Sequence, residues 1–214
     1  MVRAVATPRR TADLVVAAAG LAVLVACGIV AHNGTTPSWE ADVFHAINDL
    51  PGWLYRPVWP FQQLGTILVG PLVAIVAFVL HRRRLALAAI AATVLKLVGE
   101  RGVKLLVERQ RPGTTIGDVI LRGDVPAAGD SFVSGHALLA VALAALISPY
   151  LHRWWKLVPW VLAALNGFAR IYVGAHNPLD VVGGSALGLA IGSTLKYAFA
   201  LGPAEHPGLG RRRA

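Results

Sequence analysis

Three short segments of this chain carry side chains that suit the binding and transfer of a phosphoryl group. They lie beside apolar stretches long enough to span a membrane, where an unneeded charge is costly. The candidate site residues are cations, histidines, one acid and two small residues, namely Lys104, Arg111, Ser134, Gly135, His136, Arg170, His176 and Asp180. Together they predict a site for an anion, and more specifically phosphoryl transfer at a membrane surface.

The segment from Arg170 to Asp180 supplies a candidate nucleophile and a planar cation that can grip phosphate oxygens. Asn177 and Pro178 are the residue types of a helix N-cap and a first helical position. We therefore expect His176 at the mouth of that helix and Asp180 in its first turn, close enough to touch. A carboxylate bonded to one imidazole nitrogen fixes the tautomer and leaves the other nitrogen free to attack phosphorus. Standing alone, the pair would instead predict a structural cap with an ion pair.

The segment Ser134 to His136 suits the start of a helix. Ser134 is a good N-cap, and Gly135 lets the backbone come close to a ligand. The first turn then offers free N–H groups at the positive end of a helix dipole, which predicts an anion-binding position. His136 would project beside the bound group and could protonate a leaving oxygen. Taken alone, a histidine at a helix start is more often structural.

The third segment places charges along one face of a helix. Lys96, Glu100 and Lys104 recur every four residues, so this stripe is predicted to point into a helical bundle. Lys104 and Arg111 are separated by two helical turns, about 10 Å if the helix persists, and Pro112 biases Arg111 toward an extended backbone. Both cations can then converge on one anion. For Lys96 and Glu100 the pattern favours an internal ion pair over a supporting role at the site.

Long apolar stretches must position these residues. The 214-residue chain is 56% hydrophobic and only 14% charged, which is too apolar for an ordinary soluble domain. A membrane-spanning helix needs about 20 mostly apolar residues. Six stretches qualify, with the first expected to be a retained span rather than a secretory signal: Leu14–Ala31, Val58–Leu80, Leu85–Val107, Gly135–Leu151, Trp154–Val173 and Leu179–Leu201. The predicted fold class is all-α, an integral membrane bundle of six transmembrane helices that forms a single domain over residues 1–214.

The segments between the spans are predicted to cover the bundle. Residues Thr36 to Trp53 alternate an apolar stripe with acids, which predicts an outer interfacial helix between spans one and two. This helix either guides a lipid to the site or, as the favoured alternative, merely covers the bundle. The polar stretch from Glu108 to Val133 predicts an irregular loop over the site. Gly65 and Gly70 in span two are interpreted as packing positions rather than kinks.

The excess of basic over acidic residues is explained by the predicted membrane topology. The net charge is +9, but twelve of the twenty Lys and Arg residues fall on one side when six spans alternate: Arg3, Arg9, Arg10, Arg82, Arg83, Arg84, Arg153, Lys156, Lys196, Arg211, Arg212 and Arg213. By the positive-inside rule this side is cytoplasmic and includes both termini, so the charge does not indicate a nucleic-acid partner. The site then faces outward. Arg56, Arg109 and Arg122 share that outer side and are interpreted as solvated loop charges or headgroup contacts.

The three segments together resemble the signature of the type 2 phosphatidic acid phosphatase superfamily, which reads K-x6-RP, PSGH and SR-x5-H-x3-D. The matching residues are Lys104, Arg111, Pro112, Ser134, Gly135, His136, Arg170, His176 and Asp180, with the spacing inside each part intact. Two positions depart from the pattern, Val133 in place of proline and Ala169 in place of serine. Loss of that hydroxyl removes one hydrogen bond, worth about 1 kcal/mol if formed, so activity is still expected.

The resemblance also implies a role for each residue. His176 would be the nucleophile that forms a phosphohistidine, Asp180 its orienting partner, and His136 the acid that protonates the leaving group and then helps to activate water. The residues implied to hold phosphate oxygens are Lys104, Arg111, Arg170, Ser134 and Gly135. No cofactor and no metal are implied, in keeping with a cationic set that has no carboxylate cluster of the kind that binds magnesium.

These observations predict a membrane phosphatase that removes phosphate from a lipid phosphate or diphosphate, in the bacterial cytoplasmic (inner) membrane. By analogy with the family, a polyprenyl diphosphate or phosphate is favoured over phosphatidate and phosphatidylglycerol phosphate. One alternative is a lipid phosphotransferase that passes the phosphoryl group from His176 to another acceptor. A second is a lipid or anion transporter, although transporters tend to place charges near the midplane and to carry repeats. The oligomeric state is left open.

Overall fold

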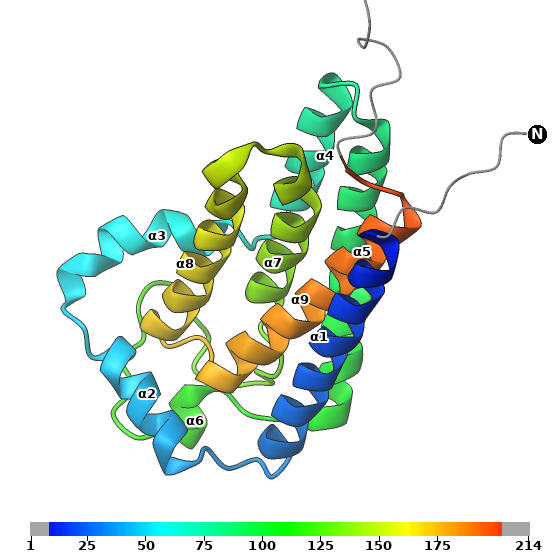
Figure 1. Cartoon of the computed structure of the whole chain (residues 1–214). Coiled ribbons are helices and arrows are strands. Elements are labelled where there is room, and N and C mark those ends of the chain that lie inside the picture. The colour runs from blue at the N-terminus through cyan, green and yellow to red at the C-terminus, as the bar shows by residue number, and fades with distance from the viewer. Residues whose placement is uncertain (1–8, 203–214) are drawn as a thin grey trace, which may run out of the picture.

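The structure is a computed structural model that describes residues 9–202, and α-helices dominate it. The helices that run along the bundle are α1 (Arg9–Ala31), α4 (Val69–Val79), α5 (Arg83–Val107), α7 (Gly135–Ile147), α8 (Val158–Tyr172) and α9 (Pro178–Ala198) (Figure 1). Helices α2 (Ser38–Asn48) and α6 (Pro112–Thr115) lie at one end of this bundle, and α3 (Tyr55–Gln63) lies across it. Within the described residues, the only β pairing is a single bridge between Gln110 and Asp130. The predicted all-helical fold is confirmed.

Most of the predicted spans coincide with a helix to within a few residues. This holds for α1, α5 and α9, and for α7 and α8 together with the short 3-10 turns Ser148–Tyr150 and Arg153–Leu157. By length and composition, Thr11–Ala31 and Pro178–Ala198 are the helices in residues 9–202 that could each cross a membrane. Val69–Val79 and Gly135–Tyr150 are apolar but shorter. The helices therefore occupy the predicted places, while the number of spans stays a prediction.

The second predicted span, Val58–Leu80, is wrong as a continuous helix. Helix α3 ends at Gln63, and α4 begins only at Val69. The 11 residues of α4 extend about 16 Å. Asn166 of α8 fixes this break because its amide donates to the carbonyls of Phe61 and Gln62, at 2.9 and 3.1 Å. These carbonyls belong to the last turn of α3, where helical hydrogen bonding is incomplete and only the Phe61 carbonyl also accepts a backbone N–H, that of Leu64 at 3.2 Å. A buried side chain that lies 105 positions from Phe61 along the chain thus decides where α3 ends.

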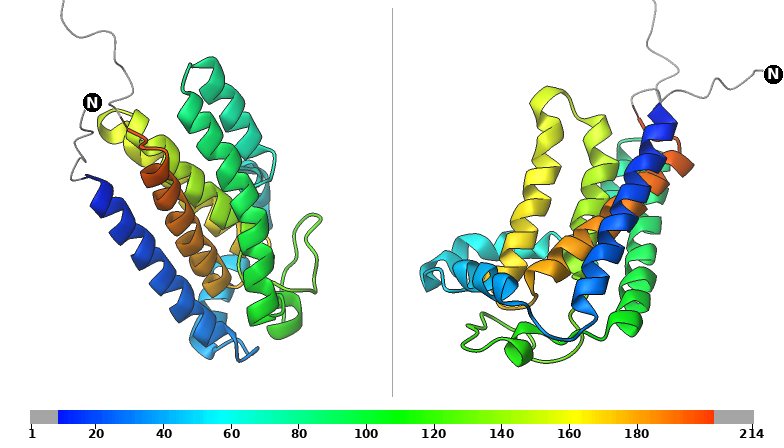
Figure 2. Two further views of the ribbon diagram at one scale, coloured as in Figure 1. Left: turned by 90° about the vertical axis from the view of Figure 1, so that its right-hand side faces the viewer. Right: turned by 60° about the horizontal axis from the view of Figure 1, so that its bottom comes forward.

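Helix α9 packs against α1 on one side and α7 on the other (Figure 2). Glycines at every fourth position of α9 bring its backbone close to that of α7. A Cβ atom at Gly184 would lie 2.4 Å from the Ser134 carbonyl oxygen, and one at Gly188 would lie 2.2 Å from that of Leu138. Small residues permit such close contact between helices. As a result the starts of the two helices meet, and the Ser134 N–H donates to the Asp180 carbonyl at 2.9 Å.

The segment from Glu108 to Val133 is largely irregular, as predicted. Helix α5 ends at Val107, and the following C-cap residue, Glu108, adopts a left-handed conformation with φ of 37°. The Ser131 hydroxyl then donates to the carbonyls of Arg109 and Gln110, at 3.1 and 2.9 Å, and holds the two ends of the loop together. This closure joins the end of α5 to the start of α7.

Different helix ends and connections lie at the two ends of the bundle. The beginning of α1, the turn from α4 to α5, the connection from α7 to α8 and the end of α9 lie at one end (Figure 1). Helices α2 and α6 and the loop after α5 lie at the other end. Four arginines used in the topology prediction, Arg3, Arg211, Arg212 and Arg213, lie outside the described residues. The chain therefore presents the predicted loop and outer helix together at a single end.

We predict that Gly188→Ala destabilises the protein because its Cβ atom would overlap the α7 backbone. Overpacking of this kind typically costs about 1–3 kcal/mol. Gly102→Ala is the matched control, since this helical glycine of α5 has no atom within 4 Å of an added Cβ. Thermal unfolding in detergent should show a lower midpoint for Gly188→Ala and an unchanged or higher one for Gly102→Ala. Equal midpoints in the two variants would contradict the close packing of α7 and α9.

Candidate active site

A polar cavity of about 440 Å³ lies between α3, α5, α7, α8 and the loop after α5. Five of the residues singled out in the sequence line it together, namely Arg111, Gly135, His136, Arg170 and His176. They come from four separate elements or connections. The three sequence segments therefore converge on one cavity. Lys104 and Asp180 do not line it but contact Glu100 and His176, which do, and Ser134 directly precedes Gly135 in the chain.

His176 lies just before α9 and is 3% exposed. Burial, followed by the nearby cations Arg170, Arg111 and Lys104, lowers its pKa well below the ordinary histidine value. The imidazole is therefore neutral at neutral pH, the state that a nucleophile requires. Its Nδ1 lies 3.6 Å from an Asp180 carboxylate oxygen, which is a contact rather than a hydrogen bond. Within the described residues Nδ1 has no hydrogen-bond partner.

Asp180 is bound to groups other than His176. Its Oδ2 accepts the Asn177 N–H at 2.8 Å, as expected where Asn177 caps α9, and its Oδ1 accepts from Arg109 Nη1 at 3.2 Å. Asp180 is fully buried. The predicted neighbourhood of His176 and Asp180 is confirmed, but the expected hydrogen bond between them is wrong in this state because the cap and Arg109 bind the carboxylate.

The prediction that Arg109 is a solvated loop charge is wrong. Arg109 is 0% exposed and pairs with Asp180 and with Glu40 of α2, which is also 0% exposed. Burial alone would lower the Arg109 pKa, but hydrogen bonds and charge from the two acids raise it overall. Glu40 Oε1 also accepts the Leu179 N–H at 2.8 Å and so satisfies an amide in the first turn of α9. A spacing rule could not find these partners, which are far apart along the chain.

The apolar stripe of α2 is only partly buried. Trp39 and Val43 are 52% and 44% exposed. The buried residues of α2 are Glu40, Phe44 and Asn48, which recur every four positions. The burial of Arg109 requires an acid at this face, so charge pairing overrides the apolar stripe.

Arg122 likewise is buried rather than solvated. Its guanidinium donates to the carbonyls of Tyr172 and Leu50, at 2.6 and 2.8 Å, and lies 4.1 Å from the centre of the Tyr172 ring. It lines the outer part of the cavity. Arg56, by contrast, is exposed as expected. Arg122 thus fastens the loop to the end of α8 and adds a cation near the site.

Arg111 and Arg170 bring two guanidinium groups to the cavity. Arg111 has the extended backbone expected before Pro112, with ψ of 157°, and donates to the Ala175 carbonyl at 2.8 Å. Burial lowers the pKa of Arg111 from its usual value. Arg170 donates to the side-chain oxygen of Gln62 at 3.2 Å, a contact that nothing in the motifs indicated. Each arginine is held by one bond to the protein, and Arg170 Nε has no partner among the described residues.

The charged stripe of α5 forms a three-membered cluster. Glu100 accepts from Lys96 Nζ at 2.9 Å and from Lys104 Nζ at 2.8 Å, which confirms the predicted ion pair. Lys96 and Glu100 line the cavity. The Glu100 carboxylate also lies against Gly135, where an added Cβ atom would be 2.0 Å from Oε2. Lys104 therefore approaches the site with a carboxylate already bound.

The start of α7 has the predicted form. Ser134 is its N-cap, and its hydroxyl accepts the Ala137 N–H at 3.5 Å. Gly135 and His136 follow as the first helical residues, whose amides have no partner inside the helix. The positive end of the helix dipole therefore points at the cavity. The two departures from the motif, Val133 and Ala169, are both 0% exposed and belong to apolar clusters.

An apolar groove of about 180 Å³ continues the face of α7 that carries His136. Ala140 and Ile147 line it, and each lies on the same helical face as His136 because they are spaced by one and three turns. Val73 of α4 and Leu162 of α8 form the other walls. The groove therefore runs from the level of the cavity into the apolar part of the bundle.

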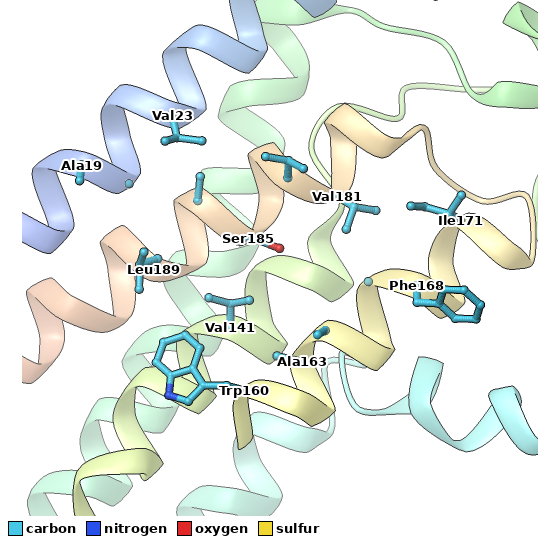
Figure 3. Close-up of a pocket in the computed structure, with 15 residues that line it drawn as sticks. Ala19, Val23, Val141, Trp160, Ala163, Phe168, Ile171, Val181, Ser185 and Leu189 are labelled. Atoms are coloured by element: carbon cyan, nitrogen blue, oxygen red, sulfur yellow. The ribbon is translucent and has the colours of Figure 1, made fainter. Parts of the chain in front are cut away.

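A second apolar cavity, of about 520 Å³, lies between α1, α8 and α9 (Figure 3). Val23, Trp160 and Leu189 point into it from these three helices. Its lining carries no cluster of charged groups, so it offers no chemistry for a phosphate. Among residues 9–202, no group of three or more His, Cys, Asp or Glu side chains lies close enough together to hold a metal ion.

Comparison with known proteins places this geometry in a family. The sequence profile described as the PAP2 superfamily matches residues 83–201. The undecaprenyl-diphosphatase of Sulfolobus acidocaldarius is 27% identical over 118 residues, which cover 55% of this chain. The chain spans 57% of the length of that curated relative.

Two solved structures are similar to this fold. The crystal structure of Aquifex aeolicus LpxE has a TM-score of 0.66 and 28% identity, and the match covers 72% of this chain and 92% of that one. The first transmembrane PAP2 type phosphatidylglycerolphosphate phosphatase from Bacillus subtilis has a TM-score of 0.68, with 83% and 94% covered. Its identity to this chain is 23%, so this second likeness concerns the fold alone.

We predict that Arg109→Met lowers the stability of the protein. The substitution leaves Glu40 and Asp180 buried without their cation, and breaking such a pair costs about 3–5 kcal/mol. Arg56→Met is the matched control because Arg56 is exposed. Thermal unfolding in detergent should show a lower midpoint for Arg109→Met alone. If both variants unfold like the wild type, the buried network does not support the fold.

Proposed function

Since the chain belongs to the PAP2 superfamily, we propose that it is a membrane lipid phosphatase that hydrolyses a lipid phosphate or diphosphate through a phosphohistidine on His176. One observation carries this proposal. Arg111, His136, Arg170 and His176 line a single polar cavity although they come from separate parts of the chain. Two cations beside a neutral buried imidazole suit the binding of a phosphoryl group and nucleophilic attack on it.

His176 is the proposed nucleophile. Its Nδ1 faces Asp180 at 3.6 Å, so Nε2 is the nitrogen that attacks phosphorus. In this step an N–P bond forms and the P–O bond to the leaving group breaks. The attack creates positive charge on the imidazole, and the nearby carboxylate of Asp180 stabilises that charge. Asp180 is therefore proposed as a positioning residue that keeps the ring in the productive tautomer.

His136 is the proposed general acid and base. It lines the same cavity from the first turn of α7. In the first step it donates a proton to the oxygen that leaves with the lipid, which is an alcohol from a monophosphate or a lipid phosphate from a diphosphate. In the second step it takes a proton from a water molecule that attacks the phosphohistidine. Inorganic phosphate then leaves, and both histidines return to their initial states.

The transition-state charge is proposed to be held by fixed cations and amides. Arg111, Arg170 and Lys104 would contact phosphate oxygens together with the α7 start at Ser134 and Gly135. Arg170 and His176 are buried, and oriented donors are more effective in a buried site than in bulk water. The proposed chemistry requires no metal ion and no cofactor. That independence separates this mechanism from metal-assisted hydrolysis and is directly testable with a chelator.

An apolar groove near the site could hold a lipid tail. It begins one helical turn from His136 on α7 and is walled by α4 and α8. A lipid headgroup in the cavity can therefore keep its chain in the apolar part of the bundle. The cavity of about 440 Å³ also exceeds the space needed for a single phosphate group. With the name of the archaeal relative, undecaprenyl-diphosphatase, this favours a polyprenyl diphosphate or phosphate over phosphatidate and phosphatidylglycerol phosphate.

We further propose that the bundle spans the membrane six times, with the site at the outer surface and both termini in the cytoplasm. The end of the bundle opposite the site carries Arg82, Arg83 and Arg84 in one turn and Arg153 and Lys156 in another. Positive charge concentrates on the cytoplasmic side of membrane proteins. The distribution supports this orientation of the proposed single membrane domain, which we propose lies in the bacterial cytoplasmic membrane.

The first prediction from this proposal concerns turnover. Purified protein in detergent with excess chelator should release phosphate from polyprenyl diphosphate faster than from polyprenyl phosphate, phosphatidate or phosphatidylglycerol phosphate. His176→Ala should lower the rate by about a thousandfold or more, because it removes the group that forms the covalent bond. Rapid quenching should trap an acid-labile, base-stable phosphoenzyme in the wild type and none in His176→Ala.

His32→Ala is the control, since His32 is exposed at the end of α1. Its rate should equal that of the wild type. Release that the chelator abolishes would contradict the metal-free mechanism. A phosphoenzyme that forms but discharges only to an added alcohol or lipid acceptor would identify a phosphotransferase. Substrate binding with no phosphoenzyme and no release would favour a transporter.

The second prediction concerns topology. Gly117→Cys lies in the loop at the site end, where an added Cβ atom has no neighbour within 4 Å. His152→Cys is exposed in the connection from α7 to α8. A membrane-impermeant maleimide should label Gly117→Cys in intact cells and His152→Cys only after the membrane is opened. The native Cys27 is buried and serves as the background control. Labelling of both positions in intact cells would contradict the proposed arrangement.

A further inference from the structure

The end of helix α3 forms one wall of the cavity. Gln62, in the last turn of α3, is 8% exposed and lines the cavity together with His136, Arg170 and His176. No motif in the sequence pointed to this glutamine. It also lies outside residues 83–201, the segment that the family profile matches. Its role is therefore inferred from its contacts.

Gln62 bonds directly to one of the arginines that are proposed to bind phosphate. Its side-chain oxygen accepts from Arg170 Nη1 at 3.2 Å. Because an arginine can only donate hydrogen bonds, the amide must turn its oxygen toward Arg170. In the part of the chain that the structure describes, this is the one hydrogen bond made by the Arg170 side chain, whose Nε is buried without a partner. Gln62 therefore fixes the direction of this guanidinium.

A neutral acceptor suits this position better than an acid. An amide oxygen orients a guanidinium but leaves its positive charge uncompensated, whereas a carboxylate forms an ion pair with it. Arg109 shows the second case, since the two acids Glu40 and Asp180 bind it and neutralise it. Arg170 shows the first case and keeps its charge for an anion. A side chain already held in one rotamer also loses less conformational entropy when a ligand binds.

The turn that carries Gln62 is itself held from two sides. The Asn166 amide donates to two backbone carbonyls of the last turn of α3, and the bond to the Gln62 carbonyl is 3.1 Å long. Asn166 precedes Arg170 by one helical turn, so both lie on the same face of α8. On the other side Gly65 packs on the start of α7, where an added Cβ atom would lie 2.4 Å from the His136 carbonyl oxygen. This turn therefore has little room to shift.

We propose that Gln62 is a positioning residue of the phosphate site, which holds the Arg170 guanidinium in the orientation that binds a phosphoryl group. This inference rests on the proposed function, in which Arg170 contacts phosphate oxygens. Gln62 acts through Arg170, so it contributes to binding and to the transition state only while that guanidinium is present. Arg111 has a comparable support in the Ala175 carbonyl, at 2.8 Å. Both arginines are thus held by neutral oxygens and keep their charge.

A purely structural role for Gln62 predicts different behaviour. If the side chain only packed α3 against α8, its removal would lower stability, and any loss of activity would be the same whichever residue stands at position 170. If Gln62 positions Arg170, the loss appears only while the arginine is present. The two roles therefore differ in whether substitutions at the two positions act independently.

The test is a double-mutant cycle on kcat/KM for polyprenyl diphosphate in detergent. Gln62→Met keeps the length of the side chain but removes the acceptor, and it should lower kcat/KM about tenfold, as expected for one hydrogen bond to a charged group. In an Arg170→Lys background, which lacks the planar fork, the same substitution should change kcat/KM by less than about twofold. An equal loss in both backgrounds, or no loss in the wild type, would overturn the proposal. Gln62→Leu, which also removes the acceptor, decides the result if Gln62→Met does not fold.

Gln63→Met is the matched control because Gln63 lines the same cavity but makes no bond to Arg170 within residues 9–202. Its effect on kcat/KM should be the same in the wild-type and Arg170→Lys backgrounds. If Arg170→Lys abolished the effect of Gln63→Met as well, the coupling would be a general response of α3, and the specific role of Gln62 would be overturned.

Binding of inorganic phosphate, measured by calorimetry in detergent, repeats the cycle without turnover. Gln62→Met should weaken phosphate binding in the wild type and leave it unchanged in Arg170→Lys. If wild-type protein binds phosphate and releases it from lipids but the two substitutions act independently, only the role of Gln62 is wrong. If wild-type protein neither binds phosphate nor releases it from any lipid, the proposed function fails and the role of Gln62 fails with it.

Discussion

The burial of Arg109 is the constraint on which the rest of this structure depends. A guanidinium with no exposed surface requires acids at hydrogen-bond distance, and Glu40 and Asp180 supply them. A buried ion without partners costs several kcal/mol, so this requirement outweighs the apolar stripe of α2 and turns Glu40 inward. The network joins α2, the segment after α5 and the first turn of α9. It also holds Asp180 in place and, through it, the position of His176.

Carboxylates mark the starts of the two helices that border the site. Glu40 and Asp180 bind amides at the start of α9, and Glu100 lies against the first residue of α7. The glycines of α9 let these two helix starts meet, and Ser134 bonds directly to Asp180 there. Two positive helix ends and several cations thus converge on one cavity. Every one of these features favours an anion.

Sequence rules that depend only on neighbouring residues account for the features that could be predicted. N-caps depend on residue type and immediate neighbours, and the structure has Ser134 and Asn177 where these rules place them. The four-residue repeat of Lys96, Glu100 and Lys104 likewise specified an ion-paired stripe. Long apolar runs located most of the helices. The three motifs also converge as expected, although the roles of their residues stay proposals.

The sequence by itself determined most of the helices, the caps at Ser134 and Asn177 and five of the residues that meet in the cavity, because each follows from spacing along one segment. Only the tertiary structure decided the partners of Arg109, the end of α3 at Gln63 and the lack of a hydrogen bond between His176 and Asp180. These features depend on pairs of residues, some of which are more than one hundred positions apart in the chain. No periodicity carries such information, since burial and pairing exist only once the helices have packed.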